Sequence, residues 1–263
     1  MKKLLLLSAM LIFACSSDDS SDNDDNNNNN NTFICDGAPY QSIVYGTQEW
    51  TVENACHTTY RDGTPIPHYS GENSVTMSNL TTGAWCYYDN DPTKYKIYNW
   101  FAVAGIHDND PNTPNKEFAP EGWHVPTDAE WTTLKNHLIA NGYNYDSTTT
   151  GNKIAKSMSS TTGWLNPTDV LVDTGEIIEP GAPGINQSLN NSSGFNAFPE
   201  GHRSRYAFAN EGYQANFWSS TEAASVGFDG LLAWRIDLRL SKSSLRGDWN
   251  WKRDVFSVRL VKD

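Results

Sequence analysis

Hydrophobic and polar positions alternate in three stretches of this sequence. Residues 234–240 and 256–260 carry an apolar side chain at every second position, with polar or charged side chains between them. Residues 39–52 also alternate and are interrupted by Gly46-Thr47. Because successive side chains of a strand point to opposite faces of the sheet, the first two stretches predict β-strands. The third predicts a β-hairpin that turns at Gly46-Thr47.

The apolar spacing becomes helical over residues 127–141. Thr127 and Glu130 form a Thr-x-x-Glu capping box that predicts the start of this helix, and Gly142 predicts its end. The apolar residues that recur at helical spacing are Trp131, Leu134 and Leu138.

Shorter helices are expected near residues 99–104 and 153–158. Residues 165–193 are rich in Gly, Pro, Asn and Asp and are expected to be mostly loop. Strands early in the chain, helices in the middle and strands late predict an α+β domain. The two ends of that domain are expected to lie close together.

Residues 1–14 have the layout of a secretory signal peptide. Two lysines precede an apolar run that is too short to span a bilayer, and Ala14 is the small residue before the cleavage point. A thiol directly after it is typical of a bacterial lipoprotein signal. We therefore expect Cys15 to become the lipidated first residue of the mature chain, with an ordinary signal peptide as the alternative.

Residues 16–31 contain no apolar side chain. Such a segment cannot bury enough surface to offset its conformational entropy, so residues 15–32 are expected to form a lipidated, disordered tether before a domain over residues 33–263. The Ser-Asp-Asp run after Cys15 resembles export signals that place Bacteroidetes lipoproteins on the outer face of the outer membrane. The expected location is therefore the outer membrane, with the domain lipid-anchored and exposed at the cell surface.

The charge balance is acidic, with 19 Lys and Arg against 31 Asp and Glu and a formal net charge of −12. An acidic surface repels nucleic acid and anionic headgroups. We therefore expect no nucleic-acid partner, and a membrane link that depends on the acyl chains.

Three cysteines remain once Cys15 is assigned to lipid: Cys35, Cys56 and Cys86. Their spacing matches no Cys-x-x-Cys zinc pattern, and disulfides persist outside the cytoplasm. A disulfide between Cys56 and Cys86 is the preferred prediction, because both lie in segments with signals of order. Pairing of Cys35 with either one stays open.

Eight short motifs occur in order along the chain. They are residues 46–50 (GTQEW), 53–54 (EN), 62–67 (DGTPIP), 98–100 (YNW), 122–131 (GWHVPTDAEW), 194–197 (GFNA), 217–222 (FWSSTE) and 256–259 (FSVR). Together they resemble the Fibrobacter succinogenes major paralogous domain, which is common in secreted proteins and lipoproteins of Bacteroidetes and Fibrobacteres. The resemblance implies a C-type-lectin-like fold with short antiparallel sheets and long irregular loops, distantly related to formylglycine-generating enzymes. It implies no characterised molecular activity.

The chain departs from that family at two positions. Many members have cysteines where Phe118 and Leu260 stand here, so we expect an apolar contact between these two residues in place of a disulfide. Copper-dependent formylglycine-generating relatives need paired cysteines near the C-terminal end, and no cysteine follows Cys86. That chemistry is therefore not expected.

No other catalytic or cofactor motif is present in the sequence. The histidines show no His-Glu-x-x-His spacing, and there is no Gly-x-Ser-x-Gly elbow or phosphate-binding loop. Residues 108–112 carry alternating oxygen ligands, but an EF-hand starting at Asp108 needs Gly where Thr113 stands and Glu where Ala119 stands. We therefore predict neither a metal site nor a bound cofactor.

The best candidate for binding is an aromatic pair near the C-terminal end. Trp249 and Trp251 are two residues apart, so in an extended segment both indoles face one side. Arg246, Asp248 and Asn250 are expected to surround this apolar platform with hydrogen-bonding groups, an arrangement that suits a sugar ring. The alternative is that both indoles belong to the core.

The sequence therefore predicts a cell-surface lipoprotein that presents a non-catalytic binding or adhesion domain, with glycans or an extracellular polymer as the possible ligand. Two other functions stay open. One is an enzyme acting on an envelope or extracellular substrate, and the other is a purely structural envelope protein.

Overall fold

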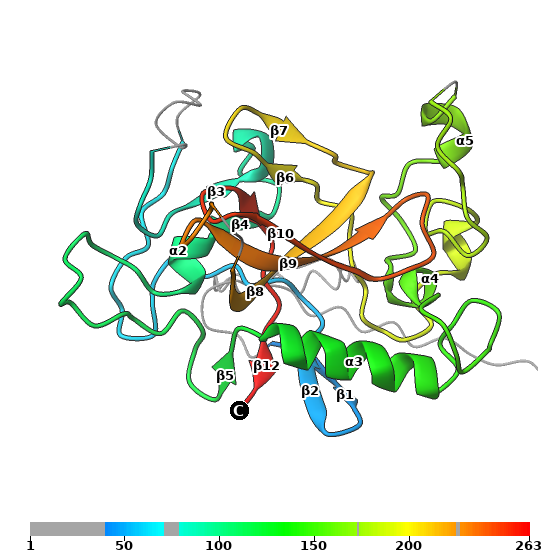
Figure 1. The fold of residues 1–263 in the computed structure, drawn as a ribbon, viewed down its shortest axis with the longest axis horizontal. Helices are drawn as coiled ribbons and strands as arrows, with labels where there is room; N and C mark the ends of the chain where they lie inside the picture. Colours follow the sequence, from blue (N-terminus) through cyan, green and yellow to red (C-terminus); the bar gives the residue numbers. More distant parts are fainter. Residues whose placement is uncertain (1–39, 71–78, 173, 225–226) are drawn as a thin grey trace, which may run out of the picture. The chain divides into compact units, whose positions relative to one another are not determined.

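A computed structural model describes residues 40–70, 79–172, 174–224 and 227–263 (Figure 1). These residues belong to one of two contact-defined units of the chain, Ile34–Asp263. The unit is a mixed α+β structure in which antiparallel strand pairs predominate and helices are few. The predicted α+β class is thus confirmed.

The first sheet joins the two ends of this unit. Its strand order is β1 (Ser42–Tyr45), β2 (Gln48–Thr51), β12 (Val261–Lys262) and β5 (Trp123–His124). The predicted hairpin is formed by β1 and β2, and Gly46 at its turn has a φ of +64°, a conformation that glycine adopts without strain. Since β12 pairs with β2, the expected proximity of the two ends is confirmed.

The second sheet contains the candidate binding strand. Its order is β10 (Arg246–Trp251), β9 (Leu232–Arg239) and β8 (Gln214–Ala223). The alternation predicted over residues 234–240 therefore lies almost wholly in β9. Within the described residues β10 pairs only with β9, so it is an edge strand.

The third sheet has the order β3 (Trp85–Tyr87), β4 (Lys96–Asn99), β11 (Val255–Phe256), β6 (His202–Arg203) and β7 (Phe208–Ala209). The prediction of strand structure throughout residues 256–260 is wrong, because β11 ends at Phe256 and β12 begins at Val261. The chain leaves the third sheet after β11 and enters the first sheet at β12, and residues 254–261 are buried on every side. The polar residues of this stretch, Ser257 and Arg259, are buried as well, because they donate to Glu200 and to the Thr51 carbonyl. The alternation of apolar and polar residues therefore does not mark a solvent-facing side.

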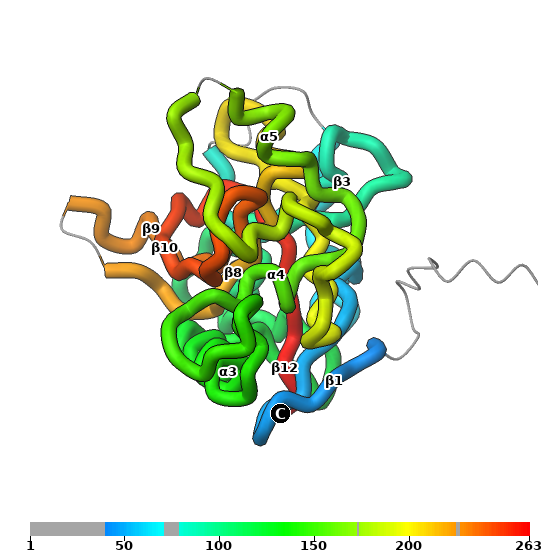
Figure 2. The backbone as a smooth tube through the Cα atoms, turned by 90° about the vertical axis from the view of Figure 1, so that its right-hand side faces the viewer, coloured from blue at the N-terminus to red at the C-terminus, as the bar shows by residue number. Residues whose placement is uncertain are grey.

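The main helix is α3 (Asp128–Ala140), and its predicted capping box is present. The Thr127 side chain accepts a hydrogen bond from the Glu130 amide, while the Glu130 carboxylate accepts from the Thr127 amide. Figures 1 and 2 both place α3 beside β12 and the β1–β2 hairpin. The remaining helices are short: η1 (Tyr88–Asn90), α2 (Trp100–Val103), α4 (Ala155–Met158), α5 (Pro167–Val170) and η2 (Gln187–Leu189). In the described part of region 165–193, which was predicted to be mostly loop, the only helices or strands are α5 and η2.

Two aromatic clusters make up most of the core. In the first, Trp131 of α3 packs against Trp50 and Phe217, at ring-centroid distances of 4.6 and 5.7 Å. The second contains Phe118 and Leu260, the two residues expected to make an apolar contact; both are buried in it. α3 and the first cluster lie beneath β8 and β9, and so support the sheet that carries β10.

Candidate binding surface

The two tryptophans of the predicted platform lie on one face of the edge strand β10. Antiparallel pairing sets Trp249 opposite Trp234 and Trp251 opposite Leu232 of β9. Directly opposed residues share a face of the sheet, and positions two apart on a strand do as well. The structure therefore brings Trp234 to the same face as the predicted pair, a residue that the sequence prediction did not include.

The exposure of these rings differs. Trp249 is 45% exposed, whereas Trp251 and Trp234 are half-buried. The ring of Trp251 already has two partners: Phe228 contacts it edge-on at 5.4 Å, and the Arg253 guanidinium lies 4.5 Å from its centroid. Trp249 is therefore the indole that is most open to a ligand. We call Trp234, Trp249, Trp251 and Phe228 the aromatic face.

The predicted ring of polar groups around the platform is wrong. Arg246, Asp248 and Asn250 alternate with the tryptophans, so their side chains lie on the opposite face of β10. The spacing that unites two indoles forces the residues between them to the other side. Asp248 and Asn250 also bind locally, because their Oδ1 atoms accept the amides of Trp249 and Trp251 at 2.9 Å.

The opposite face carries an ionic network centred on Asp237 of β9, which is fully buried. Its Oδ2 accepts a hydrogen bond from Nε of Arg239 at 2.8 Å and lies 3.1 Å from Nη1 of Arg235. Nη1 of Arg246 on β10 lies 3.9 Å from the same oxygen, and Nη2 of Arg246 lies 3.6 Å from Oδ2 of Asp248. We call Arg235, Arg239 and Arg246, with the two aspartates, the arginine cluster.

The β9 members of this cluster are not among the site residues predicted from the sequence. The signal was present, because Arg235, Asp237 and Arg239 occupy every second position and so share one face of a strand. Their meeting with Arg246 and Asp248 depends on the register of β10 against β9, which the sequence does not state.

A second buried ionisable group lies away from β10. The carboxylate of Glu200 accepts hydrogen bonds from Asn54 and from the Ser257 hydroxyl, and burial raises the pKa of Glu200 to about 7. The nearby Arg259 is also buried and donates to the carbonyls of Thr51 and Val52. Since neither charged side chain reaches solvent, we assign this group to the core, not to a ligand site.

The predicted disulfide between Cys56 and Cys86 is wrong. Cys56 is disulfide-bonded to a partner outside the described residues, while Cys86 is a free thiol buried in the third sheet. Burial raises the pKa of Cys86 to about 12, so this thiol stays protonated and unreactive at neutral pH. Cys15 and Cys35 lie outside the described residues.

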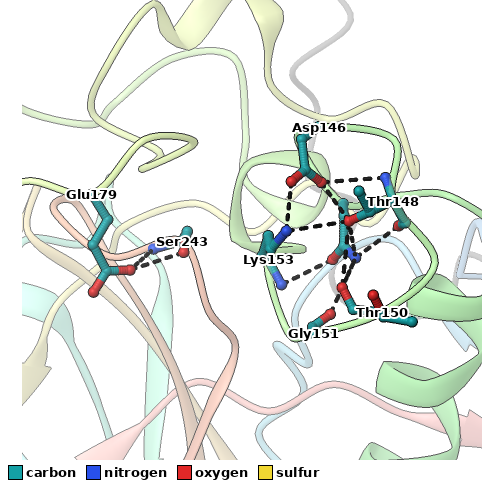
Figure 3. Close-up of polar contacts among 8 residues, drawn as sticks. Asp146, Thr148, Thr150, Gly151, Lys153, Glu179 and Ser243 are labelled. Carbon is teal, nitrogen blue, oxygen red and sulfur yellow. Dashed lines mark hydrogen bonds and ion pairs between the residues drawn. The ribbon is translucent and has the colours of Figure 1, made fainter.

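The loop after α3 is held by polar contacts (Figure 3). The buried amide of Asn144 donates to the carbonyls of Thr148, Thr150 and Gly151 at 2.8 to 3.1 Å. Lys153 pairs with Asp146 in the same loop. Figure 3 also shows the Glu179 carboxylate accepting hydrogen bonds from the amide and hydroxyl of Ser243, which ties the 165–193 region to the segment before β10.

Asp108 and Asp110, which belong to the segment tested above as a calcium-binding loop, line a surface cavity of about 310 Å³. Their Oδ1 atoms accept the amides of Asp110 and Asn112, each two residues on, as in ordinary turns. Across the part of the chain that the structure describes, no three His, Cys, Asp or Glu side chains are grouped to hold a metal ion. Nor is any described helix long and apolar enough to cross a bilayer.

The family motifs noted in the sequence build the framework beneath these surfaces. The indole of Trp218 donates to the Tyr98 carbonyl at 2.8 Å, and that of Trp100 donates to the Ser219 carbonyl at 2.9 Å. His124 lies between Asp263 and Glu130, with nitrogen–oxygen distances of 2.8 and 2.7 Å. These contacts join segments far apart in the sequence, so the motifs specify architecture.

The sequence model of the Fibrobacter succinogenes major domain matches residues 43–262. This chain belongs to that family. Trp249 and Arg246 fall inside the matched range of the Fibrobacter succinogenes major domain but outside the motifs that build its framework. No curated protein and no solved structure matches the chain.

Proposed function

We propose that this chain is a cell-surface lipoprotein whose domain is a non-catalytic binding module for carbohydrate polymers. In this proposal Cys15 is acylated, residues 15–32 tether the domain to the outer membrane, and the domain has a C-type-lectin-like fold. The signal-like residues 1–14 and membership of the Fibrobacter succinogenes major domain family support the anchored, exported part of the proposal.

The observation that carries the binding part is the exposure of Trp249. All ten tryptophans lie in described residues, and Trp249 alone is classed as exposed. An indole is a large apolar surface, and placing it against a ligand instead of water is favourable by roughly 25 cal/mol per Å². The tryptophans of the family motifs, by contrast, are used inside the framework.

The chemistry of the aromatic face favours a sugar ring as its ligand. An indole offers a flat apolar surface on which the C–H face of a pyranose packs, while its N–H can reach a hydroxyl. Trp234 lies opposite Trp249 across the strand pair and widens the contact. Because Trp251 is already covered by Arg253 and Phe228, Trp249 supplies the main stacking ring.

The test is a glycan array probed with the full chain in neutral detergent, with and without calcium. We expect Trp249→Ala to abolish binding and Trp251→Ala to weaken it less. Tyr206→Ala is the matched control, because Tyr206 is an exposed aromatic residue on the turn between β6 and β7. An array that stays blank with a folded protein rejects the carbohydrate proposal.

The anchor has its own test. Cys15→Ser removes the residue that would carry lipid, so the protein should leave the membrane fraction and lose metabolically incorporated palmitate. Unchanged acylation of the Cys15→Ser chain rejects the proposed anchor.

A further inference from the structure

The arginine cluster is a local concentration of positive charge on an acidic chain. Three guanidinium groups, those of Arg235, Arg239 and Arg246, surround two carboxylates, those of Asp237 and Asp248. The whole chain has a formal net charge of −12. A local excess of positive charge against that background attracts an anionic group to this face of β10.

The charged side chains of the cluster differ in how closely they are paired with one another. Asp237 is fully buried and is neutralised at short range by Arg235 and Arg239. The guanidinium of Arg246 makes no hydrogen bond to any described residue; its ion pairs are 3.6 and 3.9 Å long, and its side chain is 35% exposed. Arg239 is 29% exposed and uses only its Nε. The Nη groups of both arginines are therefore left to bind something else.

Two buried polar atoms of the arginine cluster also lack a hydrogen-bond partner within the described part of the chain. Oδ1 of Asp237 and Nε of Arg235 are buried and have no hydrogen-bond partner among the described residues. Of these two atoms only Nε of Arg235 is a donor, because the carboxylate oxygen of Asp237 can only accept. The capacity of the cluster to bind an anion therefore lies on the partly exposed Nη groups of Arg239 and Arg246.

We infer that Arg239 and Arg246 form a subsite for the carboxylate or sulfate group of an acidic polysaccharide. This inference rests on the proposed carbohydrate-binding function and names its ligand class. A guanidinium fork binds a carboxylate or sulfate through two parallel hydrogen bonds, which makes arginine well suited to such groups.

The position of the subsite on β10 sets the size of the ligand. Arg246 precedes Trp249 by three residues, which corresponds to about 10 Å along a strand, and the two side chains lie on opposite faces. A single sugar ring cannot reach both. The ligand is therefore an oligomer or polymer that crosses the exposed edge of β10, with one ring on Trp249 and a charged group of another at Arg246.

Asp248 competes for this subsite. Its Oδ2 lies 3.6 Å from an Nη of Arg246, so an incoming anion must displace an existing carboxylate. Asp248→Asn removes that competing charge and keeps the Oδ1 that accepts the Trp249 amide. A subsite at Arg246 therefore predicts changes of opposite sign for two nearby residues: Arg246→Ala weakens binding of an acidic polymer, and Asp248→Asn strengthens it.

The experiment measures binding of the full chain, in neutral detergent, to matched pairs of immobilised polymers. Polygalacturonate is compared with its fully methyl-esterified form, which has lost the carboxylate charge. Chondroitin sulfate is compared with desulfated chondroitin, which keeps its uronate carboxylates and has lost only the sulfates, so the two pairs separate carboxylate from sulfate recognition. We expect Arg246→Ala to weaken binding of the charged polymer about tenfold or more, with no change for the esterified one. Arg246→Lys should restore part of the affinity, because it keeps the charge but loses the fork.

Lys262→Ala is the control for loss of one positive charge, because Lys262 is exposed on β12 of a different sheet. Equal binding of the two members within both polymer pairs, or the same effect from Arg246→Ala and Lys262→Ala, overturns the subsite. If neutral polymers bind and depend on Trp249 while the arginine variants change nothing, only the subsite fails. If no polymer binds at all, the carbohydrate proposal fails with it.

Discussion

Glu200→Gln should change how the stability of this domain depends on pH. Glu200 is buried, and burial raises its pKa from an ordinary value of 4.5 to about 7. Between these two pH values the folded protein holds a proton that the unfolded chain releases, so the free energy of unfolding falls as pH rises. Glutamine mimics the protonated acid, because its carbonyl can still accept from Asn54 and its amide can donate to Ser257.

The size of the effect follows from the shift in pKa. A difference of about 2.5 pKa units corresponds to about 3 kcal/mol. Relative to wild type, Glu200→Gln should therefore be unchanged near pH 4.5 and more stable by about 3 kcal/mol above pH 7.5. The gain should accumulate between pH 4.5 and 7, where the folded protein keeps the proton.

The assay is urea unfolding of both proteins at half-unit steps from pH 4.5 to 8.5. Two other buried groups titrate in this range: burial raises the pKa of Asp254 to about 6 and lowers that of His202 to about 4. Asp254 adds a loss of stability as pH rises from 3.8, and His202 adds a loss as pH falls below 6.5. Both are present in the two proteins, so the difference between the two curves isolates Glu200. Parallel curves would falsify the argument that burial governs this carboxyl.

Three further outcomes are expected. Phe118→Ala should lower the free energy of unfolding by about 3 to 5 kcal/mol in chemical denaturation, because Phe118 is 3% exposed in the second aromatic cluster; a loss below 1 kcal/mol contradicts its role in that core. The Cys86 thiol should resist iodoacetamide at pH 8 in the folded protein and react after unfolding, as mass spectrometry of the labelled peptide will show; equal labelling in both states contradicts the burial. Asn144→Ala should cost about 1 to 3 kcal/mol and speed proteolysis within residues 144–153, because three loop carbonyls lose their donor. Thr133→Ala on the exposed side of α3 is the control for that variant, and equal proteolysis of the two argues against the role of Asn144.

Local signals predicted the local elements well. The capping box of Thr127 and Glu130 and the turn at Gly46 act over a few residues, so α3 and the β1–β2 hairpin were readable from the sequence. The segment after β11 was not readable. Ser257 and Arg259 look like solvent-facing residues, but they are buried against Glu200 and the Thr51 carbonyl, which are distant in the sequence.

The candidate binding surface was predicted only in part, because local spacing places some of its residues and contacts between strands place the others. Two residues apart on a strand means one shared face, so the pairing of Trp249 with Trp251 followed from spacing alone. The same rule, applied to Asp248, would have excluded a polar ring around the indoles. The arginine cluster could not be predicted, because it forms only when Arg246 is set opposite Asp237.

An exposed tryptophan on an edge strand is a hazard, since unpaired amides beside an apolar side chain invite a strand from another molecule. Strand β10 meets this hazard within its own sequence. In an antiparallel pair every second amide points away from the neighbouring strand, and those of Trp249 and Trp251 are already bonded to Asp248 and Asn250. Asp248 and Asn250 thus occupy two amides with which an added strand would otherwise pair. The order Asp-Trp-Asn-Trp therefore lowers the number of unpaired donors on the edge that carries the exposed indole.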